Sequence, residues 1–189
     1  MRLSGITPES IVDGPGLRYV IFTQGCLHGC PACHNPESWE INAGKEFSAK
    51  EIIRMIKKQK KIPHGAKIQG VTFSGGEPFL QAGELVPVAD AAHQIDWDVV
   101  IYTGYTYEQL IELGKNDNRI KDLVCASDIL IDGKYIDKLK SSSLPFRGSS
   151  NQRMINMIET RKKGLVVLLK EPQKTKSFLR FPLKADIIV

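Results

Sequence analysis

The stretch GLRYVIFTQGCLHGCPACHNPESW (residues 16–39) joins a strand-like segment directly to three closely spaced cysteines. Its first part alternates and is rich in β-branched and aromatic side chains, a pattern that predicts a strand over 16–25. Cys26, Cys30 and Cys33 follow with the spacing C-x3-C-x2-C, and no fourth cysteine lies nearby in the sequence. We therefore predict a sheet whose first strand ends in a loop of three thiols.

Predicted strands and helices alternate downstream of this stretch. The short connections between them imply parallel strands joined by right-handed crossovers, in a doubly wound sheet or a barrel. Ser48 has a side chain suited to a helix N-cap, and Pro87 is expected near the first turn of its helix or at a kink. Strands are expected at 68–73, 98–103, 127–133 and 165–170, and helices at 48–60, 81–94, 107–113 and 118–124.

Unusual polar or glycine-rich segments stand where the predicted strands end. They are the cysteine loop, SGGEP (74–78), TGY (103–105) and DGK (132–134). In parallel α/β folds, functional groups collect at the carboxyl ends of the strands. The sequence therefore predicts that these segments converge on one edge of the sheet.

The composition is that of an ordinary globular protein, with 189 residues, 42% hydrophobic and 25% charged, and the length fits one domain spanning 1–189. No apolar run approaches the roughly 20 residues that span a bilayer, and the N-terminal residues lack an apolar signal region. We expect no membrane association and a location in the cytoplasm. Four cysteines in that reducing compartment favour thiol or metal chemistry over disulfides.

The formal net charge is +5, and part of the basic excess lies at 57–61, 161–163 and 170–176. Solvated faces are the simplest interpretation, and an acidic protein partner fits the excess equally well. A nucleic-acid site is not expected, because no aromatic residues interleave with the basic ones and no recognised nucleic-acid-binding module is present.

Three kinds of site use cysteines at this density. A structural zinc ion needs four ligands, and His28 or His34 would complete such a set. A redox dithiol would use the C-x2-C pair but would leave Cys26 without a role. An iron–sulfur cluster is the third kind, and three cysteines on four irons would leave one iron open to a substrate or cofactor. Cys125, in the apolar segment LVCAS, is expected to be a small buried hydrophobe rather than a fourth ligand.

The cysteine loop, followed by a strand that ends in GGEP, resembles the radical S-adenosylmethionine enzymes. DGPGLR (13–18) together with TFSGGEP (72–78) resembles the enzymes that activate glycyl-radical proteins. The likeness narrows to the activating proteins of anaerobic ribonucleoside-triphosphate reductase through NPESW (35–39), YTGY (102–105), DILIDGKY (128–135) and FRGSSNQR (146–153). It runs in order over about residues 1–156 and leaves 157–189 as a C-terminal extension without an assigned role.

The resemblance implies an α/β fold with mostly parallel strands, arranged as an open-sided, partial (β/α)6 barrel. It implies that Cys26, Cys30 and Cys33 hold a [4Fe-4S] cluster, and that S-adenosylmethionine chelates the open iron. One electron, from a donor such as flavodoxin or ferredoxin, then releases a 5′-deoxyadenosyl radical. That radical abstracts hydrogen from a glycine near the C-terminus of the large subunit of the reductase.

The resemblance also implies which residues bind S-adenosylmethionine. Gly75 and Gly76 let the backbone approach the ligand, and Glu77 adds negative charge near the methionine ammonium. Asp132 is expected to accept from the ribose hydroxyls or to orient Lys134, which would neutralise the methionine carboxylate. The predicted cofactor-binding residues are Ala32, His34, Ser74, Gly75, Gly76, Glu77, Thr103, Asp132 and Lys134.

The same resemblance places further residues on either side of the cofactor. Backbone groups around Ala32 and His34 are expected to flank the adenine. At the open face where the substrate loop enters, the expected residues are Asp13, Arg147, Asn151 and Gln152, of which Arg147 is able to pair with a carboxylate in bidentate fashion. Two alternatives stay open at this point: an activator of another glycyl-radical enzyme, and a non-enzymatic interaction module stabilised by zinc.

Overall fold

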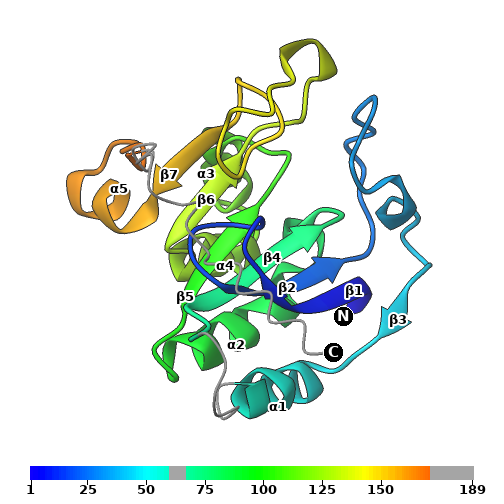
Figure 1. Cartoon of the computed structure of the whole chain (residues 1–189). Coiled ribbons are helices and arrows are strands. Elements are labelled where there is room, and N and C mark those ends of the chain that lie inside the picture. The colour runs from blue at the N-terminus through cyan, green and yellow to red at the C-terminus, as the bar shows by residue number, and fades with distance from the viewer. Residues whose placement is uncertain (60–66, 171–189) are drawn as a thin grey trace, which may run out of the picture.

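The computed structural model describes residues 1–59 and 67–170, and its strands form a single seven-stranded sheet (Figure 1). The strand order is β3-β1-β2-β4-β5-β6-β7. The four central strands, β2, β4, β5 and β6, are parallel, whereas β1, β3 and β7 run antiparallel to their neighbours. The strands are β1 (Arg2–Ser10), β2 (Arg18–Thr23), β3 (Lys45–Glu46), β4 (Gly70–Gly75), β5 (Asp98–Tyr102), β6 (Ile129–Asp132) and β7 (Arg153–Asn156).

The parallel centre of the sheet confirms the strands predicted at 16–25, 68–73, 98–103 and 127–133. The segment at 16–25 is the second strand rather than the first, because β1 precedes it and pairs with it antiparallel. β1 escaped prediction since its sequence, RLSGITPES, includes glycine and proline, and its pairing with β2 is irregular at two points.

The C-terminal edge of the sheet also differs from the prediction. β7 begins directly after the predicted substrate-loop residues Asn151 and Gln152, where no strand was predicted, and it pairs antiparallel with β6. The strand predicted at 165–170 is wrong, because this segment makes a single bridge, from Leu168 to Ile155 of β7. The remainder of the C-terminal extension, residues 171–189, lies outside the described residues.

Helices occupy the predicted ranges, and one more follows β7. Ser48 caps the first of them: its hydroxyl accepts the Glu51 amide at 3.3 Å, and the Glu51 carboxylate accepts the Ser48 amide at 2.7 Å. Pro87 stands inside its helix rather than in the first turn, so the Gly83 carbonyl lacks the usual amide donor. The helices are α1 (Ala49–Gln59), α2 (Ala82–His93), α3 (Tyr107–Leu113), α4 (Asn118–Ala126) and α5 (Met157–Lys163), with short 3-10 turns at Pro36–Ser38, Pro78–Gln81 and Asp137–Leu139.

All five helices pack against the same face of the sheet. Buried side chains from each helix join alternate residues of the central strands in one hydrophobic core. The strand residues in that core are Tyr19, Ile21, Val71, Phe73, Val99, Ile101 and Leu130. A doubly wound sheet carries helices on both faces, so the described part of the chain does not have that architecture.

The opposite face of the sheet is covered by loops instead of helices. The segment between β1 and β2 crosses it (Figure 1), where the Asp13 carbonyl accepts the Thr72 hydroxyl at 2.8 Å. A second apolar cluster lies on this face, formed by Val100, Ile131 and Met154 with side chains that include Phe146. This loop-covered face leaves room for a site at the carboxyl edge of the sheet. Among the described residues, no helix is long and apolar enough to cross a membrane.

Candidate cluster and cofactor site

A hollow of about 140 Å³ lies at the carboxyl ends of the parallel strands. Residues from all four strand-end segments line it: the cysteine loop after β2, the glycines that end β4, the TG pair after β5 and Gly133 after β6. The predicted convergence of these segments is confirmed. All three predicted ligands, Cys26, Cys30 and Cys33, line this hollow together.

Glu77 joins three of these segments by hydrogen bonds beneath the hollow. Its carboxylate accepts from the Thr103 hydroxyl at 2.9 and 3.0 Å, from the Gly104 amide at 2.9 Å and from the Phe79 amide at 3.1 Å. His28 Nε2 lies 2.7 Å from the same carboxylate. The side chain is 1% exposed, and four donors match the roughly four acceptor positions of a carboxylate.

His28 fastens the cysteine loop onto this buried carboxylate. Its side chain is 9% exposed, and its ring meets Tyr105 edge-on with the centroids 4.6 Å apart. A Cβ at position 104 would overlap the His28 ring, so glycine is required there for the contact to form. His28 therefore supports the loop from a position between the first two cysteines.

The two glycines of the GGEP turn allow the end of β4 to lie against the start of the cysteine loop. The Gly76 amide donates to Thr23 at 2.8 Å, and the Glu77 amide donates to the Gly25 carbonyl at 2.8 Å. A Cβ on Gly75, where φ is +93°, would lie 2.6 Å from the Thr23 backbone, and one on Gly76 would overlap the Gly25 carbonyl. These glycines permit close backbone packing within the protein, whereas the sequence suggested close approach to a ligand.

The donor chemistry of the hollow suits an iron–sulfur cluster. Burial raises the pKa of the Cys26 thiol above its ordinary value, although a hydrogen bond from the His28 backbone acts in the opposite direction. The Asn35 amide donates to Cys33 Sγ at 3.4 Å, the kind of contact that stabilises a ligating sulfur. Within residues 1–59 and 67–170, no three His, Cys, Asp or Glu side chains meet as they would around a single metal ion. A four-iron cluster does not require such convergence, because it distributes its thiolate ligands over separate irons.

Cys125 is remote from this hollow. It lies on α4 and lines a different, largely apolar groove with Leu110 and Val124. This position agrees with the prediction that Cys125 is not a fourth ligand beside the three cysteines of the loop. The expectation that it is buried is wrong, because the residue is exposed at the end of the helix.

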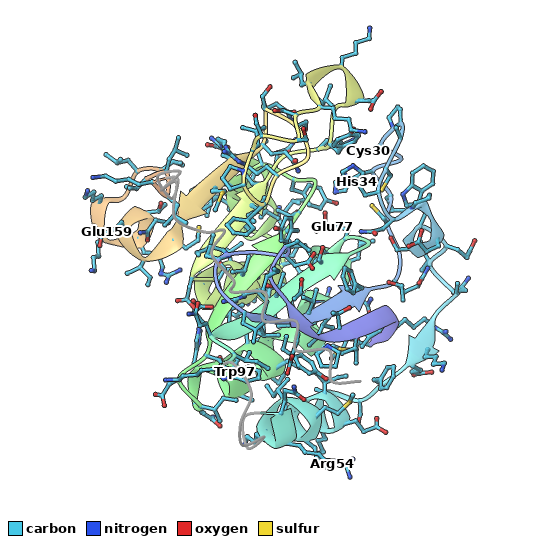
Figure 2. The ribbon with its side chains drawn as sticks, in the orientation of Figure 1. Cys30, His34, Arg54, Glu77, Trp97 and Glu159 are labelled. Carbon is cyan, nitrogen blue, oxygen red and sulfur yellow. The ribbon has the colours of Figure 1, made fainter. Side chains whose placement is uncertain are left out.

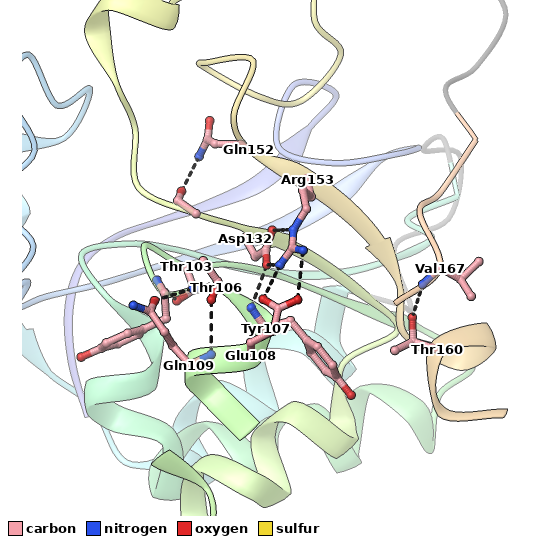
Figure 3. A network of polar contacts seen from close by, with 12 residues as sticks. Thr103, Thr106, Tyr107, Glu108, Gln109, Asp132, Gln152, Arg153, Thr160 and Val167 are labelled. Atoms are coloured by element: carbon pink, nitrogen blue, oxygen red, sulfur yellow. Dashed lines mark hydrogen bonds and ion pairs between the residues drawn. The ribbon is translucent and has the colours of Figure 1, made fainter. Parts of the chain in front are cut away.

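Thr103 and Asp132, both predicted to bind the cofactor, differ in where they point. Thr103 lines the hollow and donates its hydroxyl to Glu77. The Asp132 carboxylate points away, accepting from the Tyr107 amide at 2.7 Å and pairing with Arg153, which also holds Glu108 at 2.8 Å (Figure 3). Asp132 is 1% exposed, so its carboxylate orients the start of α3 rather than a ribose or Lys134.

Lys134 is exposed and lies outside the hollow. It lines a groove on the outer side of the cysteine loop, beside Cys30 and Lys138. Its carbonyl accepts the Asn151 side-chain amide at 2.8 Å. The predicted contact of Lys134 with a methionine carboxylate has no support from this placement.

A larger cavity of about 590 Å³ adjoins the hollow. Asp13, Arg147 and Gln152, three of the predicted substrate-loop residues, line it. The fourth, Asn151, is not among the described residues that line this cavity. His34, Ser74, Tyr102, Tyr135 and Gln152, together with Asn35, line both spaces, so the cavity and the hollow are neighbouring parts of one depression.

The predicted substrate-loop side chains make hydrogen bonds within the protein itself. The Gln152 amide donates to the Gly133 carbonyl at 3.1 Å, and its oxygen accepts the Gly148 amide at 2.9 Å. Asp13 accepts the Ser10 hydroxyl at 2.6 Å. These contacts shape the wall of the cavity, whereas the sequence suggested groups free to bind an incoming backbone.

The predicted adenine neighbours lie at the rim. Ala32 is exposed, has φ of +56° and does not line either space in the described chain. His34 lines both and packs against Tyr135 with the ring centroids 4.9 Å apart. Figure 2 shows His34 and Cys30 close together, above Glu77.

Sequence reasoning missed several residues of the site. Tyr102 and Tyr135 line both spaces, and Trp39 lines the smaller one. Each stands in a motif that the sequence singled out, YTGY, DGKY or NPESW, so the aromatic members of those motifs were the available signal. From the sequence, His28 was considered only as a zinc ligand or structural residue. No residue near it in the sequence predicts its contact with Glu77.

Comparison with known proteins agrees with this site. The family model of a 4Fe-4S single cluster domain matches residues 12–155. The anaerobic ribonucleoside-triphosphate reductase-activating protein of Escherichia coli (strain K12) is 35% identical over 153 residues, which cover 77% of this chain and 92% of that protein. The protein of the same name from Enterobacteria phage T4 is 30% identical over 162 residues, covering 82% and 93% of the two chains.

Among solved structures, QueE from Escherichia coli matches 56% of this chain and 53% of its own, with a TM-score of 0.41 and 21% identity, a partial likeness. The sequence matches are longer and closer. The chain belongs to the family of the anaerobic ribonucleoside-triphosphate reductase-activating proteins.

Proposed function

We propose that this protein is a radical S-adenosylmethionine activase that installs the glycyl radical of anaerobic ribonucleoside-triphosphate reductase. The observation that supports it best is the pairing of two spaces: a hollow lined by three cysteines, and an adjoining cavity of about 590 Å³. When bound, a [4Fe-4S] cluster and S-adenosylmethionine supply the 5′-deoxyadenosyl radical that takes a hydrogen atom from a glycine of the reductase large subunit.

In this proposal the protein's own residues position the reactants. Cys26, Cys30 and Cys33 hold the cluster, on a loop that His28 and Glu77 hold against the parallel strands. Gly75 and Gly76 line the hollow and add no side chain to it, so a ligand can lie close to the backbone there. Because the hollow and the cavity adjoin, a cofactor in the hollow would lie beside a loop that enters the cavity.

The substrate loop occupies the larger cavity in this proposal. Ile11 and Val12, about 70% exposed, border it, as does Phe146. An extended segment carrying a glycine would bury these apolar side chains, while Arg147, which donates to the Gln152 carbonyl at 3.3 Å, brings a positive charge to the cavity lining. The curved, loop-covered face of the sheet then acts as the open side of a partial (β/α)6 barrel, and the site of action is the cytoplasm.

Anaerobic reconstitution with iron and sulfide, followed by reduction, tests the proposal directly. EPR spectra should contain a four-iron signal that changes when S-adenosylmethionine is added. Incubation with the reductase should then yield a glycyl-radical signal, and another glycyl-radical enzyme in its place should not. A colourless protein that holds one zinc ion, or a cluster whose signal ignores S-adenosylmethionine, would overturn the proposal.

A further inference from the structure

The cysteine loop has a second, outer surface. A groove of about 510 Å³ lies there, between the loop residues 28–31 and the segment 134–138. Cys30 lines this groove and also the inner hollow. The loop is therefore a wall shared by two neighbouring spaces. His28 and Tyr135 also line both, and Cys30 is the proposed cluster ligand among the shared residues.

The outer groove is basic at its edge. Lys134 and Lys138 line it, and Lys140 follows on the same exposed segment. Of the described residues that line the groove, Asp137 alone is acidic, and its carboxylate accepts the Tyr135 hydroxyl at 2.8 Å. Two lysines against one carboxylate leave the groove with net positive charge within a few residues of the cluster ligands.

Apolar side chains are exposed beside these lysines. Leu27 is 70% exposed, and Ile136 and Leu139 are each 41% exposed. Exposed apolar residues rimmed by charge are typical of protein-binding surfaces. The combination fits a protein partner with an acidic rim around a small apolar centre.

We propose that this outer groove is the docking surface of an acidic one-electron carrier protein. The inference rests on the proposed function, because an activase of this kind consumes one electron that must come from outside. The carrier is oxidised by one electron and the bound cluster is reduced by one, with no bond made or broken in this transfer. Docking at the groove brings the carrier to the outer side of Cys30, where the wall is a single loop.

Geometry separates this partner from the reductase. The substrate loop must reach the cavity lined by Asp13 and Arg147, on the inner side of the wall. Of the described residues, Tyr135 alone lines both the groove and the cavity, so a carrier at the groove would leave most of the cavity lining uncovered. A second copy of this chain is the weaker alternative, because it would bring lysines against lysines on a chain of net charge +5.

Charge reversal at Lys138 tests the docking surface. Lys138 is exposed and has no part in the proposed cluster or substrate contacts, so Lys138→Glu should leave the fold intact. The matched control is Lys121→Glu on α4, which makes the same charge change at another exposed position. The probe is a reduced flavodoxin of net negative charge, used with the reconstituted holoprotein at several salt concentrations.

We expect Lys138→Glu to weaken flavodoxin binding by about tenfold at low salt, and the effect to shrink as salt rises. Lys121→Glu should change binding by less than about twofold, since Lys121 lines a different groove and would not contact the bound carrier. Flavodoxin should also reduce the cluster more slowly in Lys138→Glu, while dithionite should reduce both variants at the wild-type rate. These two electron sources separate a docking defect from damage to the cluster.

Equal effects of the two variants, or none from either, would overturn the proposal. If Lys138→Glu instead weakened binding of the reductase, or changed self-association in sedimentation, the groove would belong to that partner. Failure of the proposed function is distinguishable, because dithionite would then fail to support glycyl-radical formation in the wild-type protein as well.

Discussion

Replacement of His28 by alanine should detach the cysteine loop from the buried carboxylate of Glu77. The lost contact joins a histidine 9% exposed to a carboxylate 1% exposed at 2.7 Å. A hydrogen bond to a charged group contributes roughly 1.5–3 kcal/mol, and the edge-on contact with Tyr105 roughly 0.5–1.5 kcal/mol. We expect His28→Ala to lower the free energy of unfolding by about 2–4 kcal/mol.

Urea unfolding of the metal-free protein, followed by circular dichroism, measures this change without any contribution from the cluster. His93→Ala is the matched control, because His93 also pairs with a carboxylate, that of Asp128 at 2.9 Å, but is 40% exposed. An exposed pair of this kind contributes about 1 kcal/mol or less. His28→Ala should in addition retain less iron after reconstitution, since the loop that carries the ligands is no longer held in place.

The difference between His28→Ala and His93→Ala in the free energy of unfolding tests whether burial strengthens the contact of His28 with Glu77. A destabilisation by His28→Ala no larger than that by His93→Ala would refute the reasoning that burial makes the former contact the stronger one. Normal iron retention in a clearly destabilised His28→Ala variant would refute the idea that the His28–Glu77 contact holds the cysteine loop in place.

Three further changes test other parts of the structure. Arg153 lowers the pKa of Glu108 to about 2, so this carboxylate stabilises the fold above about pH 4.5 and loses that effect as the pH falls towards 2. The Glu108 side chain is 60% exposed, which weakens its ion pair with Arg153. In urea unfolding, Glu108→Gln should therefore lower the free energy of unfolding by only about 1 kcal/mol at pH 7 and should have no effect near pH 2. Gly76→Ala should destabilise the metal-free protein by more than about 2 kcal/mol through backbone overlap, whereas Gly5→Ala, with no atom within 4 Å of its Cβ, should change stability by less than about 1 kcal/mol. Ala32→Gly should raise the melting temperature slightly, because it relieves a left-handed backbone that costs alanine about 1 kcal/mol.

The parallel centre of the fold could be predicted because its sequence signal is local. Val71–Phe73 and Val99–Ile101 are continuous buried runs, the pattern of strands covered on both sides. β1 and β7 lack that signal, since they lie towards the edges of the sheet. Each pairs antiparallel with its neighbour, and the identity of the paired residues says little about the register. The face that carries the helices was also beyond prediction, because alternation along a strand does not tell which side the helices cover.

In the site, spacing and topology located the segments but did not orient their side chains. Cys30 and Gly76 lie where the strand-end rule places them. Asp132, at the last position of β6, points to the helical face because alternation along that strand puts it on the same side as Leu130. Lys134, two residues further on, lies on the outer surface. Its position depends on the path of the loop after β6, which alternation along the strand does not predict.

The role of Glu77 follows from its hydrogen bonds rather than from its charge. Both carboxylate oxygens are already occupied by donors from His28, Phe79, Thr103 and Gly104. A carboxylate with about four acceptor positions so filled has none left for a ligand ammonium. A cationic group in the hollow is therefore left to backbone carbonyls or to neutral side-chain oxygens such as those of Ser74 and Asn35, and the acidic residue of GGEP instead fixes the distance between the cysteine loop and the next two strands. This explains why the motif works as a unit: its glycines permit the close approach of β4 to the loop, and its glutamate holds that approach in place.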